Sequence, residues 1–410
     1  MIPAAAWALV LPGLLGSTEA GYDVGARAEV RAASPAPGDF LAGAQEIVPR
    51  IGFLLHDDEW LLSLAYYPRI YWIEPQETPA PSVMHRANLA AERKLENNRR
   101  IFGTEDFGYG LNYFSPLAGA GGVVTPAGTP PSPLQLLPGV QFANYLSSYS
   151  ILGTSLELAP LWKLDAQASW VVTGGADPNA QLQIPLERGP AAQASLAYAL
   201  SRLDALSTSV SGVRATFAPN LMTKTFTPGQ VAEMAQATES WHTQWTRSLD
   251  MTLVAGAAVA TNQFAPTAPV NQVVDPVGGI AANLKTHVAD KIVTGHLSAL
   301  VGPFLDIYGA AVFERAEGSV SANFNYERWD VSASLRGTVL LDGGARQGES
   351  LLTAELAASH EFDKSLKLEG GVRGYWQQGP PLDPLVTGNV LAWTLFVAFT
   401  ADAKGVVGGS

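Results

Sequence analysis

Apolar and polar residues alternate along most of this chain. In residues 22–31, YDVGARAEVR, one face carries Tyr, Val, Ala, Ala and Val, and the other carries Asp, Gly, Arg, Glu and Arg. A period of two is typical of a strand with one apolar and one polar face. The same alternation recurs in 163–174, 317–327 and 389–400. The pattern therefore predicts an all-β protein.

Repetition of this pattern predicts eighteen strands. They lie near 21–32, 46–56, 60–72, 83–95, 100–113, 149–160, 163–174, 190–200, 204–217, 236–247, 249–261, 276–287, 291–302, 317–327, 330–341, 350–361, 365–376 and 389–400. Their typical length of about 9–14 residues is enough for a tilted strand to cross a bilayer.

The connections between these strands alternate between short and long. The short ones lie near 57–58, 96–98, 161, 202–203, 247–248, 289–290, 328–329 and 363–364. The long ones lie near 33–45, 73–82, 114–148, 175–189, 218–235, 262–275, 303–316, 342–349 and 377–388. Outer-membrane barrels have short periplasmic turns and long external loops. Eight short and nine long connections are what eighteen strands require when both termini are periplasmic.

A soluble β-sandwich also alternates apolar and polar residues, so periodicity alone leaves that alternative open. Aromatic residues near the predicted strand ends favour a barrel, because they form two interfacial girdles. These are Trp60, Trp72, Tyr113, Trp162, Trp170, Trp245, Trp329, Trp376 and Trp393. The apolar face is also rich in Ala and Gly, which suits a lipid face better than a sandwich core. We therefore expect an integral outer-membrane, antiparallel up-and-down β-barrel.

Residues 1–20 resemble a secretory signal peptide. Their apolar run PAAAWALVLPGLLG is too short to span a bilayer, although no Lys or Arg precedes it. A buried N-terminal helix is the alternative. The transmembrane barrel is expected over 21–400, and the Gly-rich residues 401–410 are expected to form a flexible C-terminal tail.

Composition narrows the function classes. The formal net charge of −12, from 25 basic and 37 acidic residues, argues against nucleic-acid binding. Charged residues make up 15% of the chain, against about 25% in ordinary soluble domains. The chain has no cysteine, which suits an exported protein and excludes thiolate metal sites and cysteine nucleophiles.

If the apolar face meets lipid, the polar face lines a lumen. The predicted strands at the two ends of the chain carry charged residues on that face: Asp23, Arg27, Glu29, Arg31, Arg50, Arg69, Arg86, Glu92, Lys94, Arg100, Glu355, Lys367, Glu369 and Arg373. Because the last strand of a closed barrel pairs with the first, these residues are expected to form one charged wall. This wall either orients a polar solute or polymer, or simply pairs with charges on neighbouring strands.

The strands between about 190 and 335 carry mainly hydroxyl and amide groups on the same face, and they are expected to form an opposite, neutral wall. Its residues are Ser195, Ser207, Ser209, Ser211, Gln244, Ser298, Ser319, Ser321, Asn323, Asn325, Ser332 and Ser334.

The longest predicted loop, 114–148, has no charged residue and many prolines. A neutral, proline-stiffened loop is a candidate steric gate or plug. Its candidate constriction residues are Leu117, Pro130, Pro131, Leu136 and Pro138. A flexible external loop is the equally weighted alternative.

Motifs for catalysis and cofactors are weak or absent in the sequence. Ser240 with His242, and His296 with Ser298, have a spacing that could hold a Ser–His pair, but neither has a convincing third member. The acidic run 57–59 could bind a cation, yet a hairpin turn explains it equally well. We therefore expect no enzyme activity, no cofactor and no metal.

Two segments resemble hairpins of large outer-membrane barrels of myxobacteria and their relatives. They are HRANLAAERKLENNRRIFGTEDFGYG, residues 85–110, and SLAYALSRLDALSTSVSG, residues 195–212. This group includes 18-stranded, Wzp-type porins of polysaccharide export. The resemblance implies that a secreted polysaccharide crosses the outer membrane through the barrel, together with a periplasmic export protein.

Two other functions remain open at this point. One is a general or selective porin for small polar solutes, and the other is a plugged structural or adhesive barrel. Planar-bilayer conductance separates them, because a porin conducts freely and a plugged barrel does not.

Overall fold

The structure is a computed structural model that describes twelve stretches of the chain: residues 19–34, 42–73, 82–96, 99–114, 141–183, 185–218, 230–263, 269–288, 291–306, 311–342, 350–378 and 390–407. The expected signal peptide lies outside the described residues up to residue 18. The candidate constriction residues Leu117, Pro130, Pro131, Leu136 and Pro138 also lie outside them.

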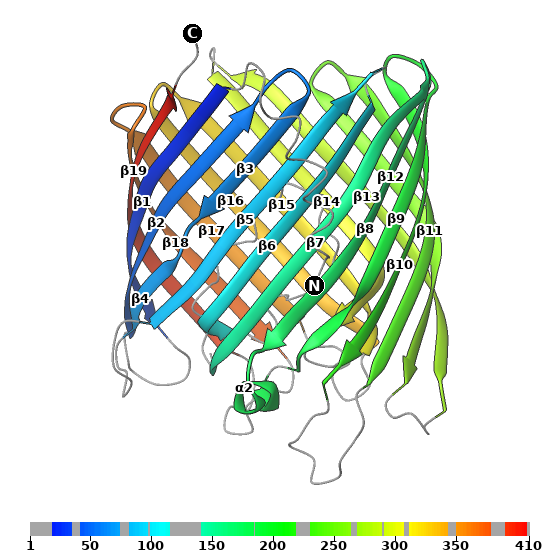
Figure 1. The fold of residues 1–410 in the computed structure, drawn as a ribbon, viewed down its shortest axis with the longest axis horizontal. Helices are drawn as coiled ribbons and strands as arrows, with labels where there is room; N and C mark the ends of the chain where they lie inside the picture. The colour runs from blue at the N-terminus through cyan, green and yellow to red at the C-terminus, as the bar shows by residue number, and fades with distance from the viewer. Residues whose placement is uncertain are drawn as a thin grey trace.

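The described residues form one antiparallel sheet that closes on itself (Figure 1). Its strands are β1 (Glu19–Ser34), β2 (Ala42–His56), β3 (Trp60–Tyr66), β4 (Arg69–Ile73), β5 (Ser82–Leu95), β6 (Arg99–Phe114), β7 (Gln141–Ala159), β8 (Trp162–Gly175), β9 (Glu187–Ala199), β10 (Asp204–Phe217), β11 (Val231–Thr246), β12 (Leu249–Gln263), β13 (Asn271–Val288), β14 (Lys291–Asp306), β15 (Ala311–Tyr326), β16 (Trp329–Asp342), β17 (Ser350–Glu361), β18 (Leu366–Gln378) and β19 (Val390–Val407). Consecutive strands pair with each other, except β3 and β4, which each pair with β2 and β5, and β1 also pairs with β19.

β3 and β4 are two halves of one wall strand. Both pair with β2 on one side and with β5 on the other. Pro68 lies at the break between them, and a proline has no N–H to give to a ladder. When β3 and β4 are counted together, the nineteen strands of the sheet become eighteen. The expectation of a closed, antiparallel barrel of about eighteen strands is confirmed.

The seam between β1 and β19 runs from Ala20, opposite Val407, to Ser34, opposite Trp393. The expected flexible tail is therefore wrong as far as Val407. Beyond Phe399 the alternation continues with the small residues Ala401 and Ala403 facing outward, and the inward polar residues gain partners on neighbouring strands. Lys404 lies opposite Asp23, for example. The remaining residues, 408–410, lie outside the described part of the chain.

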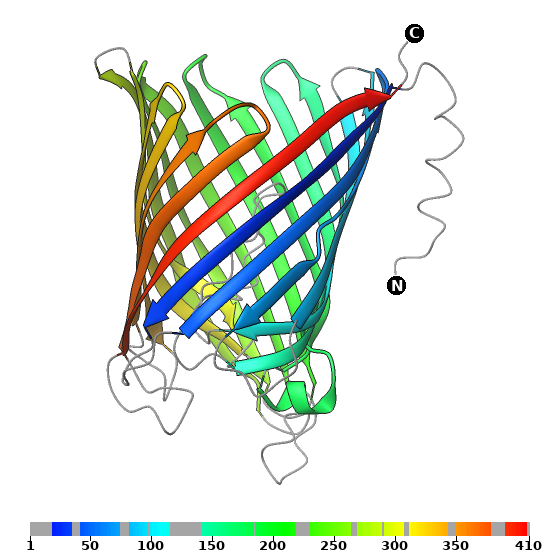
Figure 2. The same cartoon turned by 90° about the vertical axis from the view of Figure 1, so that its left-hand side faces the viewer.

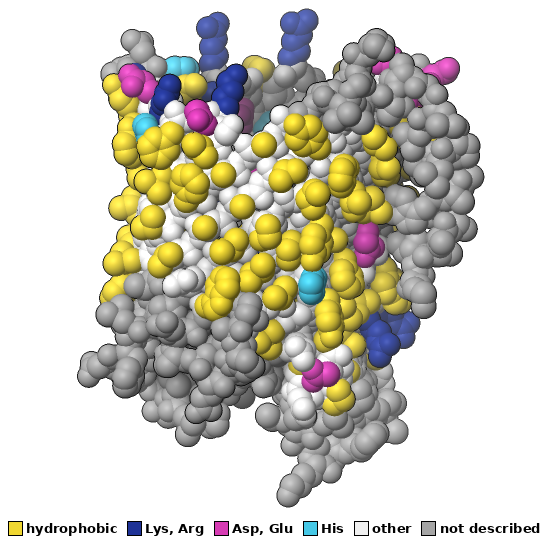
Figure 3. Space-filling model, turned by 60° about the vertical axis from the view of Figure 1, so that its left-hand side comes forward, with side chains coloured by type: hydrophobic (Ala, Val, Ile, Leu, Met, Phe, Trp, Pro, Cys, Tyr) yellow, Lys and Arg dark blue, Asp and Glu magenta, His cyan; other side chains and the backbone are white. Residues whose placement is uncertain are grey.

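The outer face of the barrel is apolar. Alternate residues of each strand point outward and stay exposed, and hydrophobic side chains cover much of the band between the two ends (Figure 3). Among the predicted girdle residues, Trp162, Trp170, Trp245, Trp329 and Trp393 are exposed large hydrophobics. A surface of this kind is stable in contact with lipid and unfavourable in water.

The apolar band gives a direct test of membrane contact. Val397 is 57% exposed in the middle of β19, so Val397→Arg should lower the free energy of unfolding in lipid by about 2–4 kcal/mol. Urea unfolding in liposomes measures this cost. Gln193→Arg, on the lumen side of β9, is the matched control and should have little effect. Equal costs for both variants would argue against a lipid-facing outer surface.

The two ends of the barrel differ. The short turns, the start of β1 and the end of β19 lie at one end, shown at the top of Figure 1 and called here the short-turn end. At the opposite end, called the loop end, β1 stops and β2 starts, and a short helix, α2 (Pro178–Gln183), lies there. Asp177 caps this helix, since its Oδ1 accepts hydrogen bonds from the N–H groups of Ala180 and Asn179 at 2.9 and 3.0 Å. The bond from Ala180 holds the pKa of Asp177 below its usual value.

Within the described stretches, no helix is long and apolar enough to cross a membrane.

Candidate functional site: the barrel lumen

The closed topology brings the predicted charged wall together. β17, β18, β19, β1 and β2 are consecutive neighbours in the barrel, so charges from both ends of the chain share one stretch of the inner face. Arg27 and Glu29 of β1 lie close to Glu369 and Arg373 of β18, although more than three hundred residues separate them in sequence.

These residues form an ion-pair network, called here the seam network, of Arg27, Glu29, Glu355, Glu369 and Arg373. Arg27 donates to Glu29 at 3.0 Å and to Glu369 at 3.2 Å. Arg373 donates to Glu355 at 2.9 Å and lies 3.7 Å from Glu29. The side chains of Arg373 and Glu29 are only 7% and 5% exposed. The charges of this network are therefore largely neutralised by one another.

Small residues on β19 allow this network to form. Ala398 lies between Glu29 of β1 and Glu369 of β18 in the ladder, and it is buried. Its methyl group leaves room for Arg27 to reach across β19. Phe396 lies on the same inner face of β19, and the guanidinium carbon of Arg373 sits 4.0 Å from its ring centroid. The seam is thus bridged by side chains as well as by backbone hydrogen bonds.

A second cluster lies nearer the short-turn end. Arg50 of β2 donates to Asp23 at 2.9 Å and to Asp402 of β19 at 3.0 Å. Gly25 of β1 lies between them, and a Cβ placed there would be 2.2 Å from Asp402 Oδ1. Only glycine permits this approach across β1. The sequence analysis assigned Asp402 to the tail because the outward residues that flank it, Ala401 and Ala403, are small.

Other predicted wall residues also have partners. Arg69 donates to Glu46 through Nε and Nη2 at 2.5 and 2.9 Å, and both side chains are buried. Arg100 lies 3.8 Å from Glu92. Arg86 lies 5.5 Å from the ring centroid of Tyr67. Lys94 is exposed, Lys367 is half-buried, and the side chain of Arg31 lies outside the described part.

The neutral wall is built from rows of amides and hydroxyls. The strand registers place Gln167, Gln193, Ser211 and Gln236 opposite one another on β8, β9, β10 and β11. Such a row cannot be recognised without the register of four strands, so sequence reasoning did not find it. Among the predicted serines, Ser298 and Ser319 hydrogen-bond across β14 and β15 at 2.6 Å. The row on β8–β11 and this serine pair offer donors and acceptors without charge, whereas Arg315, Glu317 and Arg336 place charges on the inner face of β15 and β16.

The lumen narrows where the loop ends of β14 and β15 fold inward. Leu305 and Val312, at these ends, belong to one buried apolar cluster with inner-face residues of β10–β12. Those residues are Ala215, Phe217, Ala232 and Ala260. Figure 2 shows the yellow ends of this hairpin within the barrel, near the loop end. We call residues 302–306 and 311–315 the folded-in end.

Asn262 ties the folded-in end to β12. Its side-chain Nδ2 donates to the carbonyl oxygen of Val312 at 3.0 Å, and its Oδ1 accepts from the Val312 N–H at 2.8 Å. β12 and β15 are not neighbours in the sheet, so these bonds cross the inside of the barrel. This constriction comes from strand residues. The candidate gate in 114–148 has its named residues outside the described part of the chain and stays a prediction.

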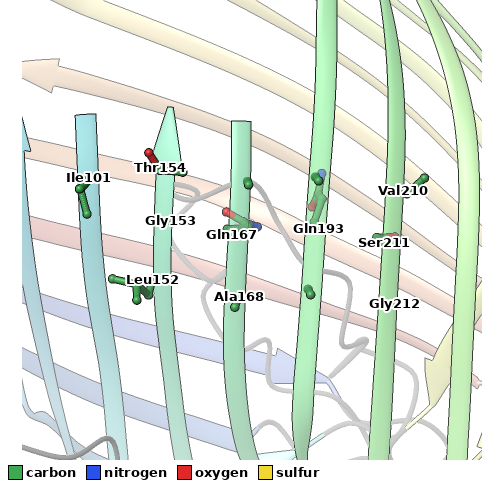
Figure 4. Close-up of a pocket in the computed structure, with 13 residues that line it drawn as sticks. Ile101, Leu152, Gly153, Thr154, Gln167, Ala168, Gln193, Val210, Ser211 and Gly212 are labelled. Carbon is green, nitrogen blue, oxygen red and sulfur yellow. The ribbon is translucent and has the colours of Figure 1, made fainter. Parts of the chain in front are cut away.

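A groove on the outer face is not part of the lumen. The exposed side chains of Ile101, Leu152 and Val210 flank it, and small residues such as Ala168 and Gly212 line it between them (Figure 4). All of these residues occupy outward positions of β6 to β10. The groove therefore belongs to the apolar surface that faces lipid.

Carboxylates such as Glu105 and Glu239 interrupt that surface. Glu105 accepts a hydrogen bond from Ser148 at 2.7 Å, and Glu239 accepts one from Thr208 at 2.7 Å. Hydroxyls on adjacent strands thus supply partners to groups that would otherwise be costly in lipid.

The candidate Ser–His pairs do not form in the structure. Their members bond to other groups: Ser240 to the carbonyl of Ser207, His242 to Thr252, His296 to Asn283, and Ser298 to Ser319. In the acidic run 57–59, Asp57 accepts the N–H groups of Glu59 and Trp60 at 2.8 and 2.6 Å, as a turn residue does. The described residues contain no group of acidic or histidine side chains arranged for a metal ion.

A closed antiparallel barrel with an apolar outer belt and a polar lumen is the architecture of an outer-membrane channel. The family model of the EpsX exopolysaccharide export family matches residues 15–407. The chain belongs to this family, and it is an outer-membrane barrel of exopolysaccharide export.

Solved structures show similar folds at very low sequence identity. OpdO of Pseudomonas aeruginosa is 10% identical with a TM-score of 0.49, over 94% of this chain and 97% of that one. OpdL of the same organism is 9% identical with a TM-score of 0.46, over 95% and 99%. The FrpB iron transporter of Neisseria meningitidis is 8% identical with a TM-score of 0.50, over 93% and 82%. A comparison with curated proteins finds no match.

Proposed function

We propose that this barrel carries a secreted polysaccharide through its lumen across the outer membrane. The observation that carries the proposal is the neutral wall of amides and hydroxyls, found in a chain of an exopolysaccharide export family. Sugars carry many hydroxyl groups that both donate and accept hydrogen bonds. A row such as Gln167, Gln193 and Ser211 offers many weak, exchangeable bonds, which favour entry without stopping movement.

The charged wall complements this role. Its guanidinium and carboxylate groups are largely paired with each other, as Arg27 is with Glu29 and Glu369. Charges that are already paired with each other in water bind a passing polymer only weakly. The lumen can therefore stay hydrated on this side while the polymer contacts the neutral wall.

The proposed orientation places both termini and the short turns in the periplasm. The asymmetry between short turns and long connections supports it, as barrels of this kind keep short turns inside. A periplasmic export protein would then dock on the short-turn end and deliver the polymer to the lumen.

Deletion of the gene tests the proposed transport. The deletion strain is expected to lose one surface polysaccharide, and the full chain supplied in trans should restore it. Retention of every surface polymer at the parental level would show the proposal to be wrong.

Docking of a partner is tested by crosslinking, because the chain has no cysteine. Asp58→Cys, in a short turn, should crosslink to a periplasmic protein in intact cells. Asn179→Cys, in α2 at the loop end, is the matched control and should not. Crosslinking from Asn179→Cys alone would reverse the proposed orientation.

A further inference from the structure

The wall between β13 and β14 opens partway along its length. Within the described parts of both strands, pairing runs from Val288 opposite Lys291 to Gly278 opposite Val301 and then stops. Beyond this point β13 continues to pair with β12, and β14 continues to pair with β15. The two strand ends therefore separate into an outer layer, from β13, and an inner layer, the folded-in end.

Two prolines face each other where the wall opens. Continuing the register by two residues places Pro276 opposite Pro303. Each still lies within the ladder to its other neighbour, opposite Ala257 and Glu314 respectively. A proline is tolerated in a strand only where no ladder partner needs its N–H. Both missing donors therefore point across the opening, and the β13–β14 ladder cannot form there.

A second opposed pair shows what prolines do alone. The β2 registers with β3 and β4 place Pro49 opposite Pro68. There the ladder resumes at once on the far side, with Ile47 opposite Ile70. Opposed prolines thus interrupt a ladder locally, but the two strands pair again beyond them. The lasting separation of β13 from β14 therefore needs an additional stabilising interaction.

The packing and hydrogen bonds of the folded-in end supply this interaction. Leu305 and Val312 are 2% and 5% exposed, because they pack on the inner wall of β10–β12. The two hydrogen bonds from Asn262 add to this packing. Val277 of the outer layer is also buried, and it lies against Gly302 of the inner layer. The prolines prevent the β13–β14 ladder from holding the hairpin in the wall, and burial of the apolar cluster stabilises its inward position.

The face of the folded-in end opposite Leu305 and Val312 looks into the lumen. It carries Phe304 and Phe313, which are paired in the ladder, and Arg315, whose guanidinium carbon lies 4.3 Å from the ring centroid of Phe304. Glu317 accepts from Arg315 at 3.2 Å and from Arg336 at 2.7 Å. Arg336 is 52% exposed and Arg315 only 10%, so Arg336 is the guanidinium group that can contact sugar oxygens near these aromatic rings.

We propose that the folded-in end sets the thickness of polymer that the lumen admits, and that Pro276 and Pro303 are the positioning residues that hold it there. The identity of the polymer rests on the proposed function, whereas the size limit is a property of the barrel alone. It can therefore be measured on the purified protein.

The test is Pro276→Val with Pro303→Val in planar bilayers. Valine restores both N–H groups and favours strands, so the ladder can extend and return the hairpin to the wall. The conductance should rise roughly twofold, since conductance follows the open cross-section, and larger polyethylene glycols should enter. The matched control, Pro49→Val with Pro68→Val, should keep the parental conductance and size limit.

A cysteine pair gives a second readout that needs no proline substitution. Asn262→Cys with Val312→Cys should form a disulfide readily in the otherwise native chain, with unchanged conductance. In the Pro276→Val, Pro303→Val background, oxidation of this pair should return the conductance to the parental level and reduction should raise it again.

Three results would overturn the proposal: a folded proline variant with the parental size limit, an equal rise in the Pro49/Pro68 control, or a cysteine pair that does not crosslink. The outcome is separable from that of the gene deletion. If the deletion strain keeps its polymers but the size limit shifts as expected, the proposed constriction is supported and only the proposed identity of the polymer is wrong.

Discussion

Arg373→Ala is expected to lower the free energy of unfolding by about 3–5 kcal/mol, the cost of breaking a buried ion pair by removing one partner. Arg373 lies between Glu29 and Glu355 and sits over the ring of Phe396. Its loss leaves Arg27 as the one cation of the seam network, against Glu29, Glu355 and Glu369, and Glu29 is 5% exposed. The seam between first and last strands closes the barrel, so the damage should reach the whole sheet.

Urea unfolding in detergent micelles, followed by tryptophan fluorescence, measures this effect. Arg93→Ala is the matched control, because Arg93 and Glu59 are 3.9 Å apart and 46% and 67% exposed. An exposed pair of this kind contributes at most about 1 kcal/mol. Adding Glu29→Gln to Arg373→Ala should recover part of the loss, since it removes one of the three carboxylates of the seam network. If both arginine variants unfold alike, the seam network does not stabilise the closure.

Alternation along the chain predicted the strands, because the outer and inner faces impose a strict period of two, but it left a β-sandwich open until the aromatic residues near strand ends favoured a barrel. The alternation of short and long connections gave the strand count, and the closed topology agrees with it. The prediction stopped at residue 400 because the outward face beyond Phe399 carries only the small residues Ala401, Ala403 and Gly405, while Asp402 and Lys404 make polar contacts on the inner face. Small outward residues give a weak signal of alternation.

The details of the lumen depend on register between strands, which a single sequence does not specify. Arg27 reaches Glu369 across β19 only because the intervening residue is the small Ala398. Arg50 reaches Asp402 across β1 only because the intervening residue is Gly25. The positions of the charges on one wall followed from alternation and closure. Their pairing across an intervening strand did not.

The folded-in end was missed for a related reason. The expected strands 276–287 and 291–302 begin and end next to the two prolines, so the residues beyond them were assigned to loops. In the structure these residues remain in strands, paired on one side only. Each proline therefore marks the point where its strand loses one of its two paired neighbours, and the strand itself continues.

Leu305→Ala is expected to release the folded-in end while the rest of the barrel stays closed. Leu305 is 2% exposed and packs on Ala215, Phe217 and Ala260. Truncating a buried leucine costs about 2–5 kcal/mol, and here the cost falls on the packing that holds one hairpin end inside. The β14–β15 ladder below it, which extends to Ile292 opposite Asn325, is untouched. Opening should therefore be local rather than global.

Hydrogen exchange separates local from global opening. In Leu305→Ala, the amides of residues 302–306 and 311–315 should exchange much faster than in the parent, and those of β1 and β19 should keep their protection. Leu297→Ala is the matched control, because Leu297 is an outward residue of the same strand and 47% exposed. Lipid fills the space that it leaves, so no cavity forms. Faster exchange throughout the sheet in Leu305→Ala would mean that the apolar cluster supports the whole wall, and unchanged exchange would mean that the hairpin end is held by the Asn262 bonds alone.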